Sequence, residues 1–276
     1  MNESIPSFKS PPLNEVFFGV QYEPIQAFDI TTYGSLWENF KEHFPVVENH
    51  APIDPSFEKT GARKQPISEL SRIRLESFNS AALPRAWFIS MDERELVQIQ
   101  PDRFIRNWRQ RSVDDEYPRY EQHIRSQFLN NLETLSSFYQ NNGMGELKPN
   151  QCEVSYINHI GADIAHDHLS DVFLGWSNDY DLSGIADIES AQINIKHIIN
   201  DDNGQFVGRL HVNVQPAFTV NGDKPIFVVE LTLRGRPLGE GLDGVMKFMD
   251  MGREKIVRAF TKMTTQKMHD LWCRER

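Results

Sequence analysis

The sequence predicts an α+β protein made of two similar halves, and three observations support this prediction. Segments rich in β-branched and aromatic residues alternate with segments of helical periodicity. The same order of elements occurs twice: a strand, a short helix, several antiparallel strands and a long helix. Identities also relate the halves at one constant spacing: Val20 with Val154, Tyr22 with Tyr156, Asp29 with Asp163, and Ile30 with Ile164.

The first half spans residues 13–147 and follows a polar, proline-containing N-terminal tail at residues 1–12. Its predicted elements are a strand at 16–22, a helix at 33–44, a long loop at 52–84, a hairpin of strands 86–90 and 96–100, and a long helix at 120–142. The long helix is predicted because apolar residues recur every three or four positions and Asn142-Gly143 supplies a left-handed stop.

The second half spans residues 148–276. Its predicted elements are a strand at 152–157, a short helical region at 169–176, strands at 191–199, 207–218 and 226–234, and a long helix at 242–272. Asn203-Gly204 predicts a tight hairpin between the first two of the three strands. The repeated order resembles helix-grip or TBP-like folds, in which a curved antiparallel sheet wraps a long helix. Such a likeness concerns the fold and implies no particular activity.

Composition argues against several classes of protein. With 276 residues, 39% of them hydrophobic, the chain can bury a sizeable core. Its formal charge of -10 argues against coating nucleic acid through bulk electrostatics. We find no secretion signal and no apolar run of membrane-spanning length, and Cys152 and Cys273 have neither metal-site nor disulfide spacing. We therefore expect a cytoplasmic protein with reduced thiols and no membrane partner.

Several short segments are distributed over nearly the whole chain. They are PPLNEVFFGVQ at 11–21, VQIQPDRF at 97–104, NWR at 107–109 and YPRY at 117–120, with AF at 259–260 and TT at 264–265 near the end. Their combination resembles a sporadically distributed bacterial family of uncharacterised proteins. The resemblance implies a mobile accessory role, for example in a defence or toxin-related locus, and carries no established activity.

A dense group of histidines and carboxylates is the first candidate site. His159, Asp163, His166 and His168 lie close together in the sequence, and neutral imidazoles with a carboxylate are ligands for zinc, iron or manganese. The segment lacks the HExxH pattern and a clearly placed distant ligand. The alternative is a polar loop in which an aspartate caps the next helix and the histidines are solvated.

An arginine-rich segment is the second candidate. Arg103, Arg106 and Arg109 lie beside Asn107 and Trp108, and Arg111 follows. Guanidinium groups bind phosphate or carboxylate in a bidentate way, and an indole can stack on a ring. The alternative is structural, because acidic residues on both sides of the segment can pair with the arginines while Trp108 packs in the core.

A polar sheet face is the third candidate. Strand alternation sends one set of side chains away from the helices: Gln192, Asn194, Lys196, Arg209, His211, Asn213, Gln215, Glu230, Thr232 and Arg234, with Gln98 and Gln100 from the first half. Amides, imidazoles and guanidinium groups can form a hydrogen-bonding recognition surface. The alternative is an ordinary solvated face, which antiparallel sheets commonly have.

These candidates favour a non-enzymatic binding or interaction protein that uses the polar sheet face and the arginine-rich segment. We expect its partner to be a protein or a small anionic ligand, bound through Arg103, Arg106, Asn107, Trp108, Arg109, His211 and Arg234. No cofactor is expected. The alternative is a metal-dependent hydrolase that holds a divalent transition metal at His159, Asp163, His166 and His168. Nucleic-acid binding ranks below both because of the acidic charge, and the sequence leaves a homodimer open.

Overall fold

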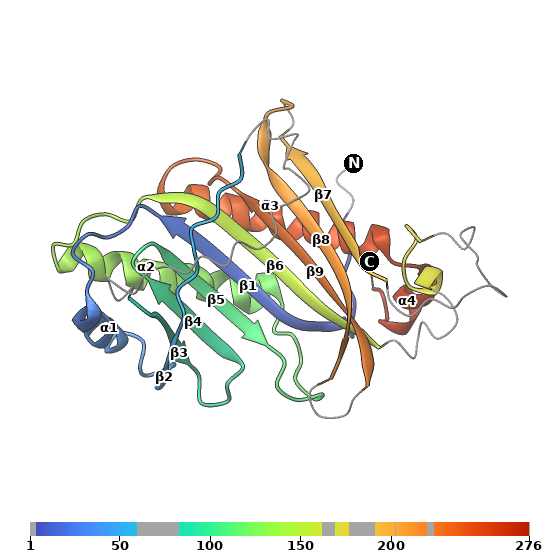
Figure 1. Ribbon diagram of the computed structural model, residues 1–276, viewed down its shortest axis with the longest axis horizontal. Helices are drawn as coiled ribbons and strands as arrows, with labels where there is room; N and C mark the ends of the chain where they lie inside the picture. The colour runs from blue at the N-terminus through green and yellow to red at the C-terminus, as the bar shows by residue number, and fades with distance from the viewer. Residues whose placement is uncertain are drawn as a thin grey trace.

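The computed structural model describes residues 4–59, 83–161, 169–176, 191–201, 203–219 and 224–275. Within these residues, nine strands form one antiparallel sheet in the order β2-β3-β4-β5-β1-β6-β9-β8-β7 (Figure 1). The strands are β1 Leu13–Tyr22, β2 Val46–His50, β3 Arg85–Ile89, β4 Glu95–Gln100, β5 Arg103–Arg109, β6 Pro149–Gly161, β7 Ile193–Asn200, β8 Phe206–Phe218 and β9 Pro225–Gly235. The helices are α1 Ile30–Trp37, α2 Arg125–Asn141, α3 Gly241–Met263 and α4 Gln266–Leu271. The α+β class is therefore confirmed.

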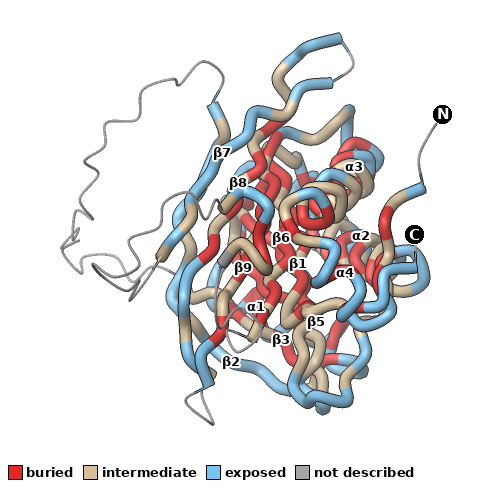
Figure 2. Tube along the Cα trace, turned by 90° about the vertical axis from the view of Figure 1, so that its right-hand side faces the viewer, coloured by how far each residue is buried: buried red, intermediate tan, exposed pale blue. Residues whose placement is uncertain are grey.

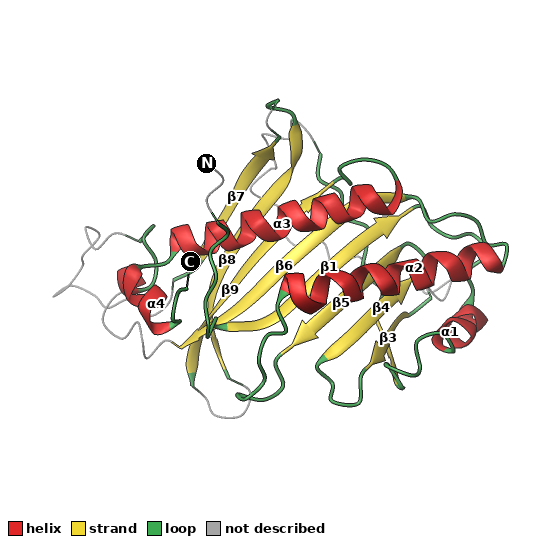
Figure 3. Cartoon of the chain, turned by 180° about the vertical axis from the view of Figure 1, so that it is seen from behind, coloured by secondary structure: helices red, strands yellow, loops and turns green. Residues whose placement is uncertain are grey.

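The two long helices, α2 and α3, lie across the same face of the sheet (Figure 3). The core fills the space between these helices and the sheet, where the buried residues concentrate (Figure 2). Gly252 lets α3 approach the sheet closely, because a Cβ atom there would lie 2.9 Å from a methyl group of Val154 on β6. The opposite face of the sheet carries no helix among the described residues.

The two halves of the chain share this sheet. β1 and β6 pair at its centre, and from them the strands of the two halves extend outward in matching order, β5-β4-β3-β2 on one side and β9-β8-β7 on the other. The long helix of each half, α2 or α3, follows the last strand of that half and lies over the half's own strands, in front of the sheet as Figure 3 shows it. The proposed boundary between residues 147 and 148 thus falls just before a central strand, and the halves bury one continuous core.

Most of the predicted elements are confirmed. The hairpin of β3 and β4, the helix α2 and the three strands β7, β8 and β9 are present with small shifts of their ends. Two strands were not predicted, β2 and β5. β5 is the arginine-rich segment itself, whose charged residues conceal its alternation. The part of the predicted loop from residue 60 to 82 lies outside the described residues.

Two predicted helices differ from the structure. The final helix is not continuous from 242 to 272, because Thr264 has extended backbone angles and forms a β-bridge with Phe173. Thr265 then caps the separate helix α4 by accepting a hydrogen bond from the amide of Met268. The first helix begins at Ile30, earlier than predicted, because Asp29 accepts amide hydrogen bonds in a capping box.

The N-terminal segment packs on the body of the protein. Phe8 is buried against the rings of Phe260 and Trp272, and it forms a β-bridge with Arg274. Residues 4–12 are therefore attached to the C-terminal end of the chain rather than extending freely as a tail.

Candidate functional site

The sheet surface opposite α2 and α3, which we call the polar face, carries a row of amide and guanidinium side chains. Gln100 of β4 lies directly opposite Arg103 of β5, Arg103 lies opposite Gln21 of β1, and Gln21 lies opposite Gln151 of β6. We call these four residues the glutamine row. Because cross-strand partners point to the same side of a sheet, their side chains form one line across the centre of the polar face.

Residues 51–59, which we call the strap, run along this row, across the front of the central strands and toward β8 (Figure 1). The amide side chain of Gln100 accepts from the backbone N–H of Ile53 at 2.9 Å and donates to its carbonyl at 3.2 Å. The side chain of Gln21 forms the same two bonds with Ser56: it accepts from the backbone N–H at 2.9 Å and donates to the carbonyl at 2.7 Å. Each glutamine thus satisfies both backbone groups of one strap residue, and we call each such pair of hydrogen bonds a clasp.

The spacing of these two clasps follows from the sheet. β4 and β1 are separated by β5, so the two glutamines stand about 10 Å apart. Ile53 and Ser56 are three residues apart, and three extended residues also cover about 10 Å. Arg103 lies between the clasps, donating to the carbonyl of Asp54 at 2.9 Å. The glutamine row therefore matches an extended backbone that crosses the strands.

The far end of the strap is fixed by charge. The carboxylate of Glu58 accepts from Arg209 at 2.7 Å and lies 2.6 Å from the Nε2 atom of His211. These side chains are only 12%, 13% and 23% exposed. Burial by itself raises the pKa of Glu58, but the hydrogen bonds and charges of His211 and Arg209 outweigh it, so that this pKa lies below the ordinary value.

The strap uses only part of the hydrogen-bonding capacity beneath it. Both polar atoms of the Gln151 amide, the Nε atom of Arg103 and the Nε atom of Arg234 are buried without a partner among the described residues. Phe57 is 48% exposed, and none of the described strap residues belongs to the hydrophobic core. The hydrogen bonds and ion pairs described above therefore anchor the strap, on a surface that can make more of them.

Strand alternation divides the predicted arginine-rich segment between the two faces of the sheet. Arg103, Asn107 and Arg109 lie on the polar face, whereas Arg106 and Trp108 point toward the helices. Arg106 is 2% exposed, pairs with Glu95 at 2.9 Å and donates to Asn131 of α2 at 3.0 Å. Trp108 packs its ring against Tyr117. Neither Arg106 nor Trp108 can reach a ligand on the polar face.

The remaining predicted binding residues lie on the polar face and have partners. Asn107 donates to Glu15 at 2.6 Å, and Arg234 pairs with Glu153 at 2.9 Å. An indole does lie on this face, but it is Trp87, with the ring of His50 stacked on it at 3.8 Å. Arg109 also lies over that indole, at 5.8 Å from the ring centre.

The structure describes only one member of the predicted metal cluster. His159 lies near the end of β6 on the polar face, where burial lowers its pKa. Asp163, His166 and His168 lie outside the described residues. Among the residues that are described, no three His, Cys, Asp or Glu side chains are grouped so as to hold a metal ion. The metal site stays a prediction.

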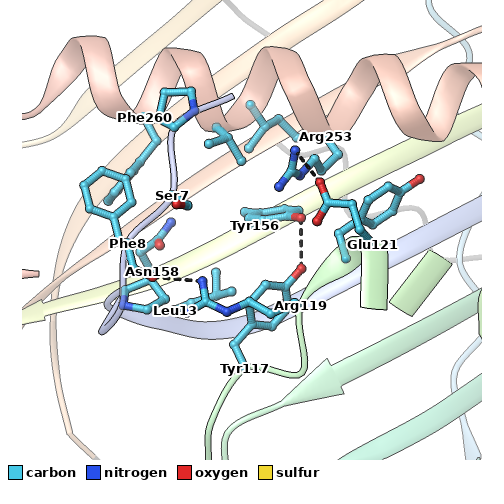
Figure 4. Close-up of a pocket in the computed structure, with 15 residues that line it drawn as sticks. Ser7, Phe8, Leu13, Tyr117, Arg119, Glu121, Tyr156, Asn158, Arg253 and Phe260 are labelled. Carbon is cyan, nitrogen blue, oxygen red and sulfur yellow. Dashed lines mark hydrogen bonds and ion pairs between the residues drawn. The ribbon is translucent and has the colours of Figure 1, made fainter. Parts of the chain in front are cut away.

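A second feature, on the helix side of the sheet, is a cavity of about 70 Å³ beneath α3 (Figure 4). Pro6, Ser7 and Phe8 of the N-terminal segment line one side of it, and α3 lines another. The hydroxyl groups of Tyr117 and Tyr156 meet there at 3.1 Å. Burial raises the pKa of both tyrosines, so both are neutral at physiological pH.

Unusual backbone and an unpaired donor converge on this cavity. Arg119 has a positive φ of 66°, and the π-helical turn at Tyr120–Ile124 begins directly after it. Such strained and irregular segments cluster at functional sites. Arg253 of α3 pairs with Glu121 at 2.9 Å, and its buried Nε atom has no partner among the described residues (Figure 4).

The fold and these sites describe an α+β protein with a polar sheet face and a small cavity beneath its last long helix. In comparisons with known proteins, no family model matches the sequence, and a search of curated proteins finds no significant match. The resemblance to a bacterial family thus stays a prediction. No helix in the described part of the chain has both the length and the apolar character needed to cross a membrane.

Proposed function

We propose that this chain is a non-enzymatic interaction protein whose polar face binds an extended polypeptide segment carrying a carboxylate. The observation that carries the proposal is the pair of clasps formed by Gln21 and Gln100 with the strap. The strap acts here as an internal stand-in for the partner segment.

Side-chain amides suit this task because each offers one donor and one acceptor with the spacing of a backbone N–H and C=O pair. They replace the ladder that an added strand would receive from a sheet edge, and they do so on the face of the sheet. Such clasps read the backbone and tolerate many side chains. Selectivity then comes from the end of the groove, where Arg209 and His211 receive an acidic side chain.

Displacement of the strap by a better partner is supported by the side-chain atoms of Gln151, Arg103 and Arg234 that have no hydrogen-bond partner in the described part of the chain. A segment that continues the clasps onto Gln151 would satisfy buried polar atoms that the strap leaves without a bond, and such atoms are costly. The strap, which adds no residue to the hydrophobic core and leaves these atoms unsatisfied, is the weaker occupant.

We also infer that the two halves have a common origin and form a TBP-like saddle. The matching order of strands on either side of the central pair β1 and β6 supports this inference. In such an arrangement the helices cover one face, and the other face is left for a partner.

The test uses a strap-released variant that leaves the polar face intact. Ile53→Pro and Ser56→Pro remove the two clasped N–H groups, and Glu58→Gln removes the charge at the far end. A fluorescent peptide of residues 51–59 should bind this variant at least tenfold more tightly than the wild type. In the wild type the tethered strap competes at an effective concentration of about millimolar.

Three controls make the result specific. Phe57→Ala changes an exposed strap residue and should bind the peptide as the wild type does. Gln21→Ala and Gln100→Ala, each added to the strap-released variant, should remove most of the binding. Equal peptide affinity with and without these two glutamines would refute the proposal, as would a strap-released variant that binds no better than the wild type.

A further inference from the structure

The cavity beneath α3 lies on the helix side of the sheet, separate from the polar face, and has a different chemistry. It is lined mainly by apolar side chains, among them Leu13, Ile256, Val257 and Phe260. A few polar groups project into this apolar enclosure, which is the usual composition of a small-molecule site. Its volume of about 70 Å³ accommodates about five water-sized groups, since each needs roughly 10–15 Å³.

The polar groups of the cavity present donors. Tyr117 and Tyr156 share one hydrogen bond, which uses one of their two hydroxyl hydrogens and leaves the other available. The buried Nε–H of Arg253 is a second donor without a partner among the described residues. Figure 4 shows the guanidinium group of Arg253 next to the Tyr156 ring. Two donors from different elements thus converge on one part of the cavity.

The charge of the lining also favours an anion. The charged residues are Arg119, Arg253 and Glu121, which leave one positive charge in excess. Glu121 is 60% exposed and binds Arg253 from the solvent side, whereas the Arg253 side chain is 13% exposed. A buried guanidinium with one unused N–H is suited to a carboxylate oxygen.

We propose that this cavity binds a small monocarboxylate, with its carboxylate at Arg253 and the tyrosine pair and its short apolar body against Leu13, Ile256 and Phe260. The strained Arg119 holds the entrance side in place, because its guanidinium donates to the carbonyl of Phe8 at 2.8 Å. The inference is independent of the polar face and of any peptide bound there.

Butyrate is the probe, because its roughly six non-hydrogen atoms match the volume of the cavity. Isothermal titration at constant ionic strength should give a dissociation constant of about 0.1–1 mM, which is ordinary for a ligand of this size. The matched probes n-butylamine and 1-butanol have the same number of carbon atoms, with an ammonium or hydroxyl group in place of the carboxylate, and should bind at least tenfold more weakly. Equal binding of 1-butanol, or no binding of butyrate, would overturn the proposal.

Two variants separate a donor in the cavity from a structural ion pair. Arg253→Gln and Glu121→Gln both break the same ion pair, but only Arg253→Gln removes the positive charge and the Nε–H from the cavity. We expect at least a tenfold loss of butyrate affinity in Arg253→Gln and unchanged or tighter binding in Glu121→Gln. Equal losses in both variants would mean that the pair merely supports the fold, and the proposal would fail.

A third variant keeps the experiment decisive if Arg253→Gln does not fold. Tyr156→Phe keeps the ring and the packing of the cavity and removes one hydroxyl group. It should bind butyrate about tenfold more weakly, with an unchanged circular dichroism spectrum. Wild-type affinity in Tyr156→Phe would contradict the assigned position of the carboxylate.

Discussion

Removing the carboxylate of Glu58 should release the far end of the strap. Glu58→Ala deletes the acceptor for Arg209 and the partner of His211, which are 13% and 23% exposed. Charge-assisted hydrogen bonds of this kind contribute about 1.5–3 kcal/mol, and the two share one carboxylate, so we expect a combined loss of about 2–3 kcal/mol in strap docking. This corresponds to about a 30- to 150-fold larger undocked population.

Hydrogen exchange measures that population directly. The backbone amides of Ile53 and Ser56 are bonded to the two clasping glutamines, so their protection should fall by about 30- to 150-fold in Glu58→Ala. The matched control is Glu48→Gln, which breaks an exposed pair with His50 and should change protection less than twofold. Unchanged protection in Glu58→Ala would refute the view that charge holds the strap on the sheet.

Three further predictions concern pH, stability and thiol chemistry. Because the folded pKa of Glu58 lies below the ordinary value, strap docking should weaken as pH falls through that depressed pKa, whereas Glu58→Gln should show no such loss on the acid side in a pH series of exchange rates. Arg106→Ala should lower the free energy of unfolding in urea by about 2–5 kcal/mol because it leaves a cavity in place of a buried side chain and removes the hydrogen bonds to Asn131 and Glu95, while Arg109→Ala should cost about 1 kcal/mol or less. Cys273 is exposed and should react with iodoacetamide in the native protein, whereas Cys152, buried and with its pKa raised by that burial, should react only in denaturant, as mass spectrometry can show.

The fold was predictable wherever one face of an element is apolar. α2 and the strands β8 and β9 have clear periodicity, and the structure contains all three. β5 was missed because the helix-facing side of the strand includes the buried Arg106, so charge masks the alternation that marks a strand. The break at Thr264 depends on a bridge to Phe173, a contact between distant parts of the chain that no local pattern encodes.

The polar face could be predicted as a surface, since its composition follows from strand alternation. The binding of the strap to this face could not be predicted. Gln21 and Gln151 look like ordinary solvated residues in the sequence, and they become part of one row only through the pairing of β1 with β5 and β6. Glu58 lies in a proline-rich segment without periodicity, so nothing local links it to Arg209.

The docked strap and the proposed partner are coupled by a simple relation. If the strap occupies the polar face almost all of the time, a competing peptide binds only the small fraction of molecules in which the strap is undocked. Its apparent dissociation constant is then the intrinsic constant divided by that fraction. The Glu58→Ala change acts on that fraction and not on the clasps. The fold-increase in peptide affinity of this variant must therefore equal the fold-decrease in protection of Ile53 and Ser56, as long as the strap stays mostly docked. Agreement of the two numbers would mean that one surface serves both, whereas a large loss of protection with no gain in affinity would place the peptide elsewhere.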